Sequence, residues 1–499
     1  MTDAKPSPTP AAAPATATAK GPSGAPVARP APVRQAPTDL TLTFIDEATV
    51  RAVAAAAGDP EWLLADRLAA LAGFAALPIE SNQLYTTYVD LRNAKLAETR
   101  PSVTAVAGRP EPDTNQALLP EGAAAYSEFR DDGIAALVLS PEAHDAGVTL
   151  ESLAHLAVRD PDLLAQLLDG GCTLPEKDKL AQLTRALWSD GLFLHVPDGV
   201  RLERPIVLRW SIGAPGAALL ARTIISVGDD AEVSILEEQV SSAKPDAASD
   251  SATAPDSATT QAFFAGTTEV RVGAGSIVSF AGLQDFGANQ IAFQHRSAVV
   301  GKASTLRWAL AQLGCRVIRS RIDNRLEGDG ASVEQAEIVF GSSDQLFDLT
   351  SYTRHLGRDQ TGNLLSKGAL GDRSRAYLKG LITIDKPAHG TDSYLGEFAM
   401  LLSKQARSVA IPSLEIDQPD CRRVAHASSV GPIDETQLFY LESRGLDPDE
   451  ARKVIVLGYL EPVVARVPLE AARERLRDLL EAKWAARGGA AAVAPAAVA

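Results

Sequence analysis

The sequence feature that most constrains the fold is a strand-and-turn unit that returns at a fixed interval. Ser276, Ser304 and Ser332 each begin a strand-like stretch after a glycine-containing turn, and successive starts are 28 residues apart. The next comparable start, Ser374, follows 42 residues later. A strand unit repeated at this length indicates a solenoid, most simply a β-helix. A β-sandwich with evenly spaced strands is the alternative that the spacing leaves open.

Helical sequence flanks the strand-rich region on both sides. Residues 39–190 have mainly helical periodicity, residues 191–419 carry the strand pattern, and residues 420–487 return to helical signals. The sequence therefore predicts a mainly β protein. Its long β core lies between an N-terminal helical domain and a C-terminal helical domain that begins with the segment around His426.

Three segments are poor in large apolar residues. Residues 1–38 and 488–499 are rich in alanine, with proline and threonine in the first of them, and residues 240–261 interrupt the strand-rich region with a low-complexity stretch. Such segments cannot bury enough apolar surface to offset the entropy of an ordered chain. We expect two disordered tails and one flexible surface insertion.

The overall charge and the cysteines exclude several classes of protein. The chain has 499 residues, a net charge of −15 and three cysteines. An acidic chain is a poor binder of nucleic acid or of an anionic membrane. Three cysteines cannot form a disulfide framework in a chain of this length. We find no secretory signal and no apolar run of the roughly 18 residues that span a bilayer, so we expect a cytoplasmic protein.

Most catalytic signatures are absent. The sequence contains no HExxH, CxxC or GxSxG motif and no dinucleotide-binding fingerprint. Gly301-Lys302 lacks the leading glycine and the following Ser or Thr of a phosphate-binding loop. His355 and His389 lie in the strand region and could meet across turns of a solenoid, although surface or satisfied polar histidines are the simpler interpretation. We expect no enzyme activity.

The stretch DCRRVAHASSVG places one histidine among small residues. In an extended strand, Val424, His426 and Ser428 share one face. The small neighbours would let another backbone approach the imidazole, which can bind a soft or borderline metal at neutral pH. One histidine is not a site by itself, so further ligands must come from elsewhere in the fold or from another chain. A purely structural histidine is the alternative.

A helix pair follows this stretch directly. Asp434 and Gln437 form a capping-box signature, and Gly445 is placed to end the first helix. Asp447 and Pro448 then form the start signal of a second helix.

Several pieces of the sequence together resemble the SufB/SufD family of iron–sulfur cluster assembly scaffolds. The resemblance runs from about residue 39 to 465, apart from the insertion. The pieces that carry it are PSLEI at 412–416, HASSVG at 426–431, LFY at 438–440, SRGL at 443–446, LFLHVPDGVRLERPI, KGALGDRSRAYLKGLITI and GDPEWLLADRLAAL.

The histidine stretch is most similar to the SufD pattern. The sequence departs from that pattern at Val424, where the family often has cysteine, and at Ala427, where it has glycine. The nearest thiol, Cys421, precedes His426 by five residues, which would place it on the opposite face of a regular strand. We therefore expect no cysteine–histidine pair within this chain.

The resemblance implies a right-handed parallel β-helix with helices at both ends. It also implies a non-catalytic subunit of a hetero-oligomer that pairs with a SufB-like chain and binds a SufC-like ABC-type ATPase. His426 is then a candidate ligand of iron or cluster at the SufB-like interface. Phe439, Tyr440 and Arg444 are candidate ATPase contacts, with core packing inside the helix pair as the alternative for the two aromatic residues. No cofactor is expected to stay on this chain alone, and the cluster would be assembled transiently on the complex.

Two other functions remain open at this stage. One is a SufB-type or self-pairing scaffold. The other is a β-helix carbohydrate-active enzyme, which needs two carboxylates roughly 5–10 Å apart. The low aromatic content of 5% argues against a sugar-binding groove.

Overall fold

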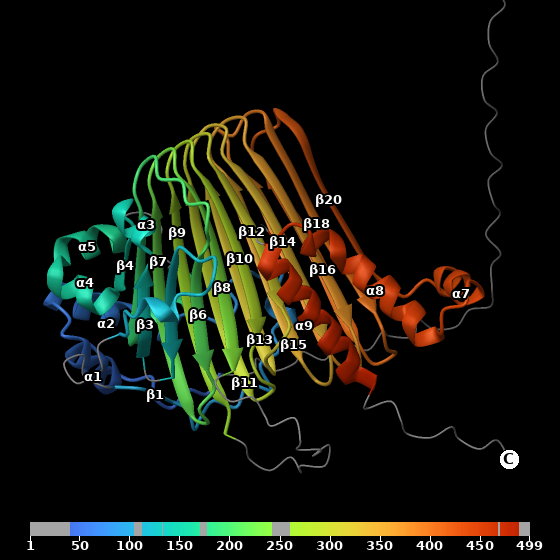
Figure 1. The fold of residues 1–499 in the computed structure, drawn as a ribbon, viewed down its shortest axis with the longest axis horizontal. Helices are drawn as coiled ribbons and strands as arrows, with labels where there is room; N and C mark the ends of the chain where they lie inside the picture. Colours follow the sequence, from blue (N-terminus) through green and yellow to red (C-terminus); the bar gives the residue numbers. More distant parts are fainter. Residues whose placement is uncertain are drawn as a thin grey trace, which may run out of the picture. The chain divides into compact units, whose positions relative to one another are not determined.

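The computed structural model describes residues 40–103, 112–131, 133–169, 177–241, 260–467 and 470–488. In these residues a long β-solenoid carries helices at both ends of the chain (Figure 1). The predicted disordered tail at 1–38 lies outside the described residues, as do 489–499 of the predicted tail at 488–499 and 242–259 of the predicted insertion.

Two sheets run side by side along the solenoid. Sheet 1 contains, in spatial order, β4 (Thr149–Ser152), β5 (Asp190–Val196), β7 (Ala217–Val227), β9 (Ala262–Val272), β11 (Gln290–Val300), β13 (Val317–Leu326), β15 (Leu346–His355), β17 (Arg375–Ile384) and β19 (Arg407–Ile416), and β1 (Arg100–Pro101) pairs with β7. Sheet 2 contains β3 (Gly133–Leu139), β2 (Ala125–Arg130), β6 (Ile206–Ile212), β8 (Glu232–Ser241), β10 (Ile277–Asp285), β12 (Thr305–Gln312), β14 (Ser332–Gly341), β16 (Thr361–Leu370), β18 (Thr391–Leu401) and β20 (Cys421–Pro432).

The pairing confirms the predicted parallel β-helix. From β5 and β6 to β19 and β20 the chain alternates between the sheets, each strand pairs in parallel with the strand two further on, and the solenoid has about eight turns. The interval of 28 residues is one full turn, because Ile277 of β10 is the register partner of Thr305 of β12. Ser374 precedes β17 in the other sheet, so its interval of 42 corresponds to one and a half turns.

Serine hydroxyls form hydrogen bonds within the turns that the repeat predicted. The Ser276 hydroxyl donates to the carbonyl of Gly228 at 2.6 Å, and the Ser304 hydroxyl donates to Gly301 at 2.7 Å. Both serines are fully buried. A buried hydroxyl needs such a partner, so these serines fix the path of the chain as it enters each strand.

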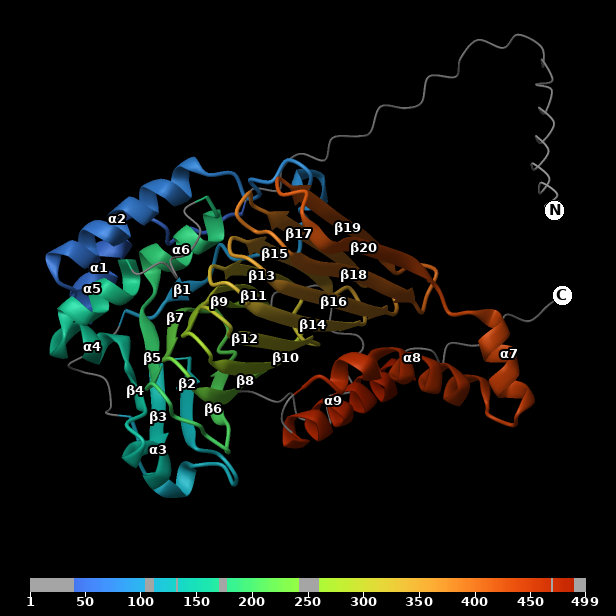
Figure 2. The ribbon, with the colours of Figure 1, turned by 90° about the horizontal axis from the view of Figure 1, so that it is seen from above.

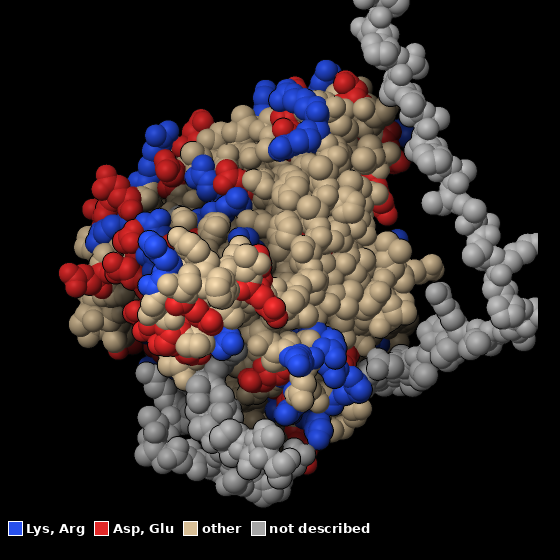
Figure 3. Space-filling model, turned by 90° about the vertical axis from the view of Figure 1, so that its right-hand side faces the viewer, with Lys and Arg blue, Asp and Glu red and all other residues tan. Residues whose placement is uncertain are grey.

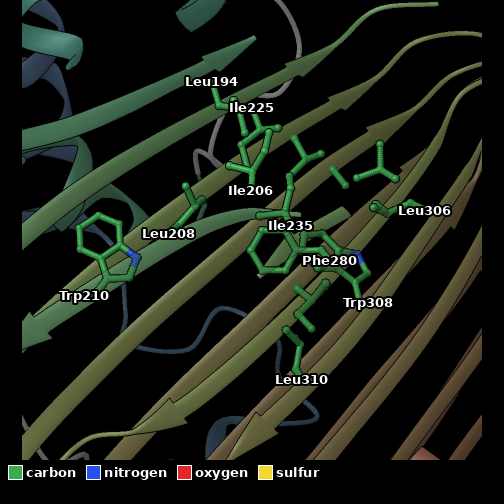
Figure 4. Packing of buried hydrophobic residues seen from close by; sticks show 14 of the residues in the cluster. Leu194, Ile206, Leu208, Trp210, Ile225, Ile235, Phe280, Leu306, Trp308 and Leu310 are labelled. Carbon is green, nitrogen blue, oxygen red and sulfur yellow. The ribbon is translucent and has the colours of Figure 1, made fainter. Parts of the chain in front are cut away.

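Apolar side chains of successive turns stack inside the solenoid. Ile206, Ile235, Phe280 and Trp308 are consecutive register partners on β6, β8, β10 and β12, and they form one row in Figure 4. The Phe280 and Trp308 ring centroids are 4.9 Å apart. Because parallel in-register strands point equivalent side chains to the same side, each turn buries the row of the turn before it.

N-terminal helices cover the outer face of sheet 1. The described helices of this region are α1 (Glu47–Ala57), α2 (Glu61–Ala76), α3 (Pro141–Asp145), α4 (Leu153–Arg159), α5 (Pro161–Asp169) and α6 (Lys179–Leu187), with 3₁₀ turns η1 (Thr86–Tyr88) and η3 (Gln116–Leu118). Val50, Ala70 and Leu183 pack with Phe263 and Phe293 of the sheet.

The region 39–190 is less purely helical than the sequence predicted. It also contributes β1, and β2 to β4 extend both sheets at the first turn of the solenoid. These short strands pair with sheet edges that would otherwise be unpaired. The helical periodicity of the local sequence does not predict them.

The C-terminal helices are α7 (Glu435–Ser443), α8 (Pro448–Val464) and α9 (Glu470–Gly488). Leu460 of α8 and Leu476 of α9 pack on alanines of the outer face of sheet 2, including Ala309 and Ala336. Helix α7 instead projects away from the sheets (Figure 2). The predicted C-terminal helical domain was placed too early in the chain, since residues 421–432 around His426 form the last strand of the solenoid.

The open end of the solenoid as a candidate functional site

The solenoid ends in two strands that each have one unpaired edge. Among the described strands β19 pairs only with β17, and β20 pairs only with β18. We call these two strands the open end. An edge strand presents a row of free backbone N–H and C=O groups, and monomeric proteins normally protect such an edge with charge.

The open end lacks that protection over most of its length. Residues 408–414 of β19 and 424–431 of β20 carry no charged side chain. Figure 3 faces this side of the molecule and shows a broad uncharged surface bordered by charged groups. Arg422 and Arg423 lie at the start of β20, where they form ion pairs with Asp359 and Asp392. The charge is therefore confined to the rim, and the strand edges themselves are neutral.

His426 lies in the middle of β20 and faces the interior of the solenoid. Its register partner on β18 is Leu395, which is 1% exposed and packs in the interior. The imidazole therefore points to the same side as Leu395, yet it is exposed because no turn follows it. No hydrogen bond or ion pair from the described residues reaches it.

Cys421 corrects one expectation. A β-bulge pairs Cys421 with Thr391 and Arg423 with Asp392, so Arg422 is an extra residue. The bulge resets the alternation, and Cys421 packs on the interior cluster on the same side as His426. The opposite-face prediction assumed a regular strand and was wrong.

The thiol of Cys421 still does not form a pair with His426. Four register positions separate them, or about 13 Å along a strand, which is too far for one ion to bridge. Burial, together with the neighbouring Asp420, raises the pKa of the thiol, whose Sγ donates to the carbonyl of Gln418 at 3.1 Å. Cys421 is thus a protonated thiol at neutral pH rather than a ready metal ligand.

Glu397 lies one turn behind the open end, at a position that sequence motifs did not reveal. It is the register partner of Ser428 and is 2% exposed. Burial raises the pKa of Glu397 to about 8, and a hydrogen bond from the backbone N–H of Ile411 acts in the opposite direction. The alternation along strand β18 could have predicted that this side chain lies inside the solenoid. It could not have predicted that no described residue forms an ion pair with the Glu397 carboxylate. At neutral pH the interior behind His426 is therefore uncharged.

The other two candidate histidines do not meet. His355 is fully buried and its Nε2 lies 3.1 Å from the Ser393 hydroxyl, whereas His389 is half exposed and its Nδ1 lies 3.2 Å from Asp420. Across the described part of the chain, no group of three or more His, Cys, Asp or Glu side chains is arranged to hold a metal ion. None of the described residues therefore joins His426 in such a group.

Helix α7 follows the open end after two residues and exposes its aromatic side chains. Asp434 caps it by accepting from the backbone N–H of Thr436. Phe439 is 71% exposed and Tyr440 is 60% exposed, so neither packs inside the helix pair. Arg444 is exposed, and among the described residues it has no ion-pair partner. No described helix is both long and apolar enough to cross a membrane.

Comparisons with known proteins give a consistent result. A family described as SUF system FeS cluster assembly, SufBD core domain, matches residues 211–459, and the SufBD protein N-terminal region matches residues 132–208. The iron–sulfur cluster assembly protein SufD of Bacillus subtilis is 28% identical over 355 residues, which cover 71% of this chain and 78% of that protein.

Two further relatives show how broad the similarity is. SufB of Bacillus subtilis is 27% identical over 303 residues, or 61% of this chain and 62% of that protein. An iron–sulfur cluster assembly SufBD family protein of Staphylococcus haemolyticus is 24% identical over 442 residues, or 87% of this chain and 92% of that protein.

Proposed function

Because the chain belongs to the SufBD family of iron–sulfur cluster assembly proteins, we propose that it is a SufD-like, non-catalytic scaffold subunit. It pairs with a SufB-like chain and binds a SufC-like ATPase. We propose the cytoplasm as its location, which the lack of a disulfide framework supports.

The observation that carries this proposal is the neutral open end. Two adjacent strands offer unpaired backbone groups without protecting charge. A partner that adds strands to both sheets would satisfy these groups and continue the solenoid, a form of β-strand addition. Ile416 and Val430 are 48% and 39% exposed at this end and would be buried by such a partner.

His426 would then lie inside the paired interface. Its small neighbours Ala425 and Ala427 leave room for a partner backbone, and its imidazole has no competing partner in the described residues. A neutral imidazole beside a partner thiolate suits iron or a nascent cluster, which here is cargo rather than a resident cofactor. Among the described residues, Cys421 is too far along the strand and Cys315 is buried, so we propose that the partner supplies that thiolate.

Helix α7 is the proposed contact of the ATPase. Phe439 and Tyr440 are exposed on α7, and Arg444 at its end has no ion-pair partner among the described residues. Aromatic and arginine residues are the types that dominate protein interfaces. The sequence carries no nucleotide-binding loop, so the energy of ATP hydrolysis would enter the complex through the partner.

Replacement of His426 by alanine tests the ligand role. The full complex with its SufB-like and ATPase partners is purified, and cluster content and subunit composition are measured separately. We expect an intact complex with much less cluster. An intact complex with unchanged cluster content would overturn the ligand role, and loss of the complex would show that the histidine is structural. His155→Ala, at an exposed histidine on α4, is the matched control.

Replacement of Phe439 and Tyr440 by serine tests the docking role of α7. The double variant should lose the ATPase during co-purification and retain the SufB-like chain, because the two surfaces lie on different elements. Retention of the ATPase would rule out α7 as its contact.

The neutral edges also favour a second candidate, a self-pairing scaffold. A second copy of this chain could add its own β19 and β20 to the same edges. Light scattering on the purified chain, with and without the SufB-like partner, separates the two candidates. A dimer that persists in the presence of the partner supports self-pairing, and exchange into a heterodimer supports the main proposal.

A further inference from the structure

A cleft of about 340 Å³ opens where three turns of the solenoid meet the loop that precedes β1. Arg316, Asp344 and Arg373 lie in turns that lead into β13, β15 and β17. Arg375 begins β17, and the loop contributes Asp90 and Arg92. We call these six residues the arginine cleft.

The arginine cleft carries an excess of positive charge in an acidic chain. Its four guanidinium groups face two carboxylates, whereas the whole chain has a net charge of −15. Asp90 accepts from Arg92 at 2.6 Å and from Arg375 at 3.2 Å. Asp344 accepts from Arg373 at 2.6 Å. Each carboxylate is thus already paired, and two positive charges remain.

Arg316 and Arg375 hold the unused donors. Among the described residues, the nearest carboxylate oxygen to the Arg316 guanidinium is that of Asp344 at 3.9 Å, which is too long for a hydrogen bond. Arg375 has one hydrogen bond to a side chain, to Asp90, out of five possible N–H donors. The side chains of Arg316 and Arg375 are 38% and 45% exposed.

The charge of Arg375 acts on both carboxylates. The pKa of Asp90 is lowered mainly by its hydrogen bond to Arg92, and the pKa of Asp344 mainly by its hydrogen bond to Arg373. The charge of Arg375 contributes to the lowering at both sites. The positive field therefore extends across the whole cleft rather than around one ion pair.

We propose that the arginine cleft binds a small phosphate-bearing molecule through Arg316 and Arg375. A guanidinium presents a planar fork of donors that matches phosphate oxygens, and two arginines with unused donors line this cleft. The volume lies at the lower end of the range for small-molecule sites, roughly 300–1,000 Å³, and Leu346 supplies an apolar wall. Ion pairs with Asp90 and Asp344 account for Arg92 and Arg373. Arg375 joins the loop to the solenoid through one bond to Asp90 and keeps further donors, and the pairing leaves Arg316 without a hydrogen bond to a carboxylate.

Calorimetric titration of the purified full-length chain with inorganic pyrophosphate tests the site. Arg316→Gln and Arg375→Gln should each weaken binding about tenfold, as expected for the loss of one charge-assisted contact. Arg354→Gln is the control, because Arg354 is an exposed arginine paired with Asp385 elsewhere on the solenoid. Titration with citrate separates phosphate recognition from general attraction of carboxylates.

Three outcomes would overturn the proposal. The first is no heat of binding at about 10 mM pyrophosphate, a concentration far above the dissociation constants of specific complexes. The second is that Arg354→Gln weakens pyrophosphate binding as much as the two cleft variants do. The third is that citrate binds as tightly as pyrophosphate. Circular dichroism of each variant shows whether a loss of binding is due to unfolding. If it is, the question is decided by titration of Arg316→Lys, which keeps the positive charge but lacks the planar fork of donors. This test is independent of partner pairing and cluster content, so its failure leaves the proposed function untouched.

Discussion

Leu395 and His426 occupy the same register position on neighbouring strands but have opposite environments. Leu395 on β18 is 1% exposed, whereas His426 on β20 is open to solvent. The difference arises because β20 covers β18 and no described strand covers β20. One added strand would give His426 the environment that Leu395 already has, so a partner strand at this edge would control access to the imidazole.

A lysine in β20 should prevent pairing at the open end. Val430 is the register partner of the buried Ala399 and is 39% exposed. Val430→Lys would place an inward charge on the edge, the device by which edge strands resist pairing. We expect the SufB-like partner to be lost from co-purification while the unfolding free energy of the isolated chain changes by at most about 0.5 kcal/mol. Val158→Lys, at a site 71% exposed on α4, should retain the partner, and loss of pairing in both variants would contradict the edge model.

Gly380 should tolerate no side chain, because it faces the interior one turn behind the open end. A Cβ at this position would lie 2.6 Å from Leu395 and 2.8 Å from the Glu397 carboxylate. Gly380→Ala should destabilise the chain by about 1–3 kcal/mol through overpacking. Gly368→Ala is the matched control, since its nearest neighbour would be 3.6 Å away. Urea unfolding of both variants measures the difference, and equal stabilities would show that the interior adapts at Gly380.

Acid should destabilise the chain through His355. Burial lowers the pKa of this histidine from 6.5 to about 4. Between these values the unfolded chain binds a proton that the folded chain does not, so stability present above pH 6.5 is lost as the pH falls towards 4.

The difference between wild type and His355→Asn isolates this contribution. The wild type should lose more stability than His355→Asn in urea unfolding between pH 7 and pH 4. The variant His144→Asn, at a histidine whose side chain is 77% exposed, should behave like the wild type. Parallel pH profiles of wild type and His355→Asn would refute the assignment.

Lys379 should be essential to the buried ion network beneath the N-terminal loop. Its side chain is fully buried, 2.5 Å from Asp348 and 3.9 Å from Glu80. Lys379→Met would remove the ion-pair partner of the buried Asp348 carboxylate, at a cost of about 3–5 kcal/mol.

An exposed ion pair provides the comparison for Lys379. Lys453→Met, which breaks the partly exposed pair with Glu481, should cost about 0–1 kcal/mol. Chemical unfolding measures both variants. A change at Lys379 no larger than that at Lys453 would mean that water reaches the buried network.

The sequence alone determined the repeating architecture and the ends of several helices. Each turn of the solenoid has a glycine turn followed by alternating strand residues, so the interval between Ser276 and Ser304 indicated a solenoid, although it left a β-sandwich open. The caps at Asp434 and Asp447 are likewise local. Both residues cap their helices, although the Asp434 carboxylate accepts from the backbone N–H of Thr436 and not from Gln437 of the predicted capping box.

Only the tertiary structure decided which residues meet. The bulge at Arg422 reversed the predicted side of Cys421, because register depends on the neighbouring strand and not on the strand itself. The arginine cleft joins Asp90 and Arg375, which are 285 residues apart. The local sequence pattern determines the conformation of one turn of the solenoid. The contacts between turns and loops depend on how distant segments pack, and the local sequence does not predict them.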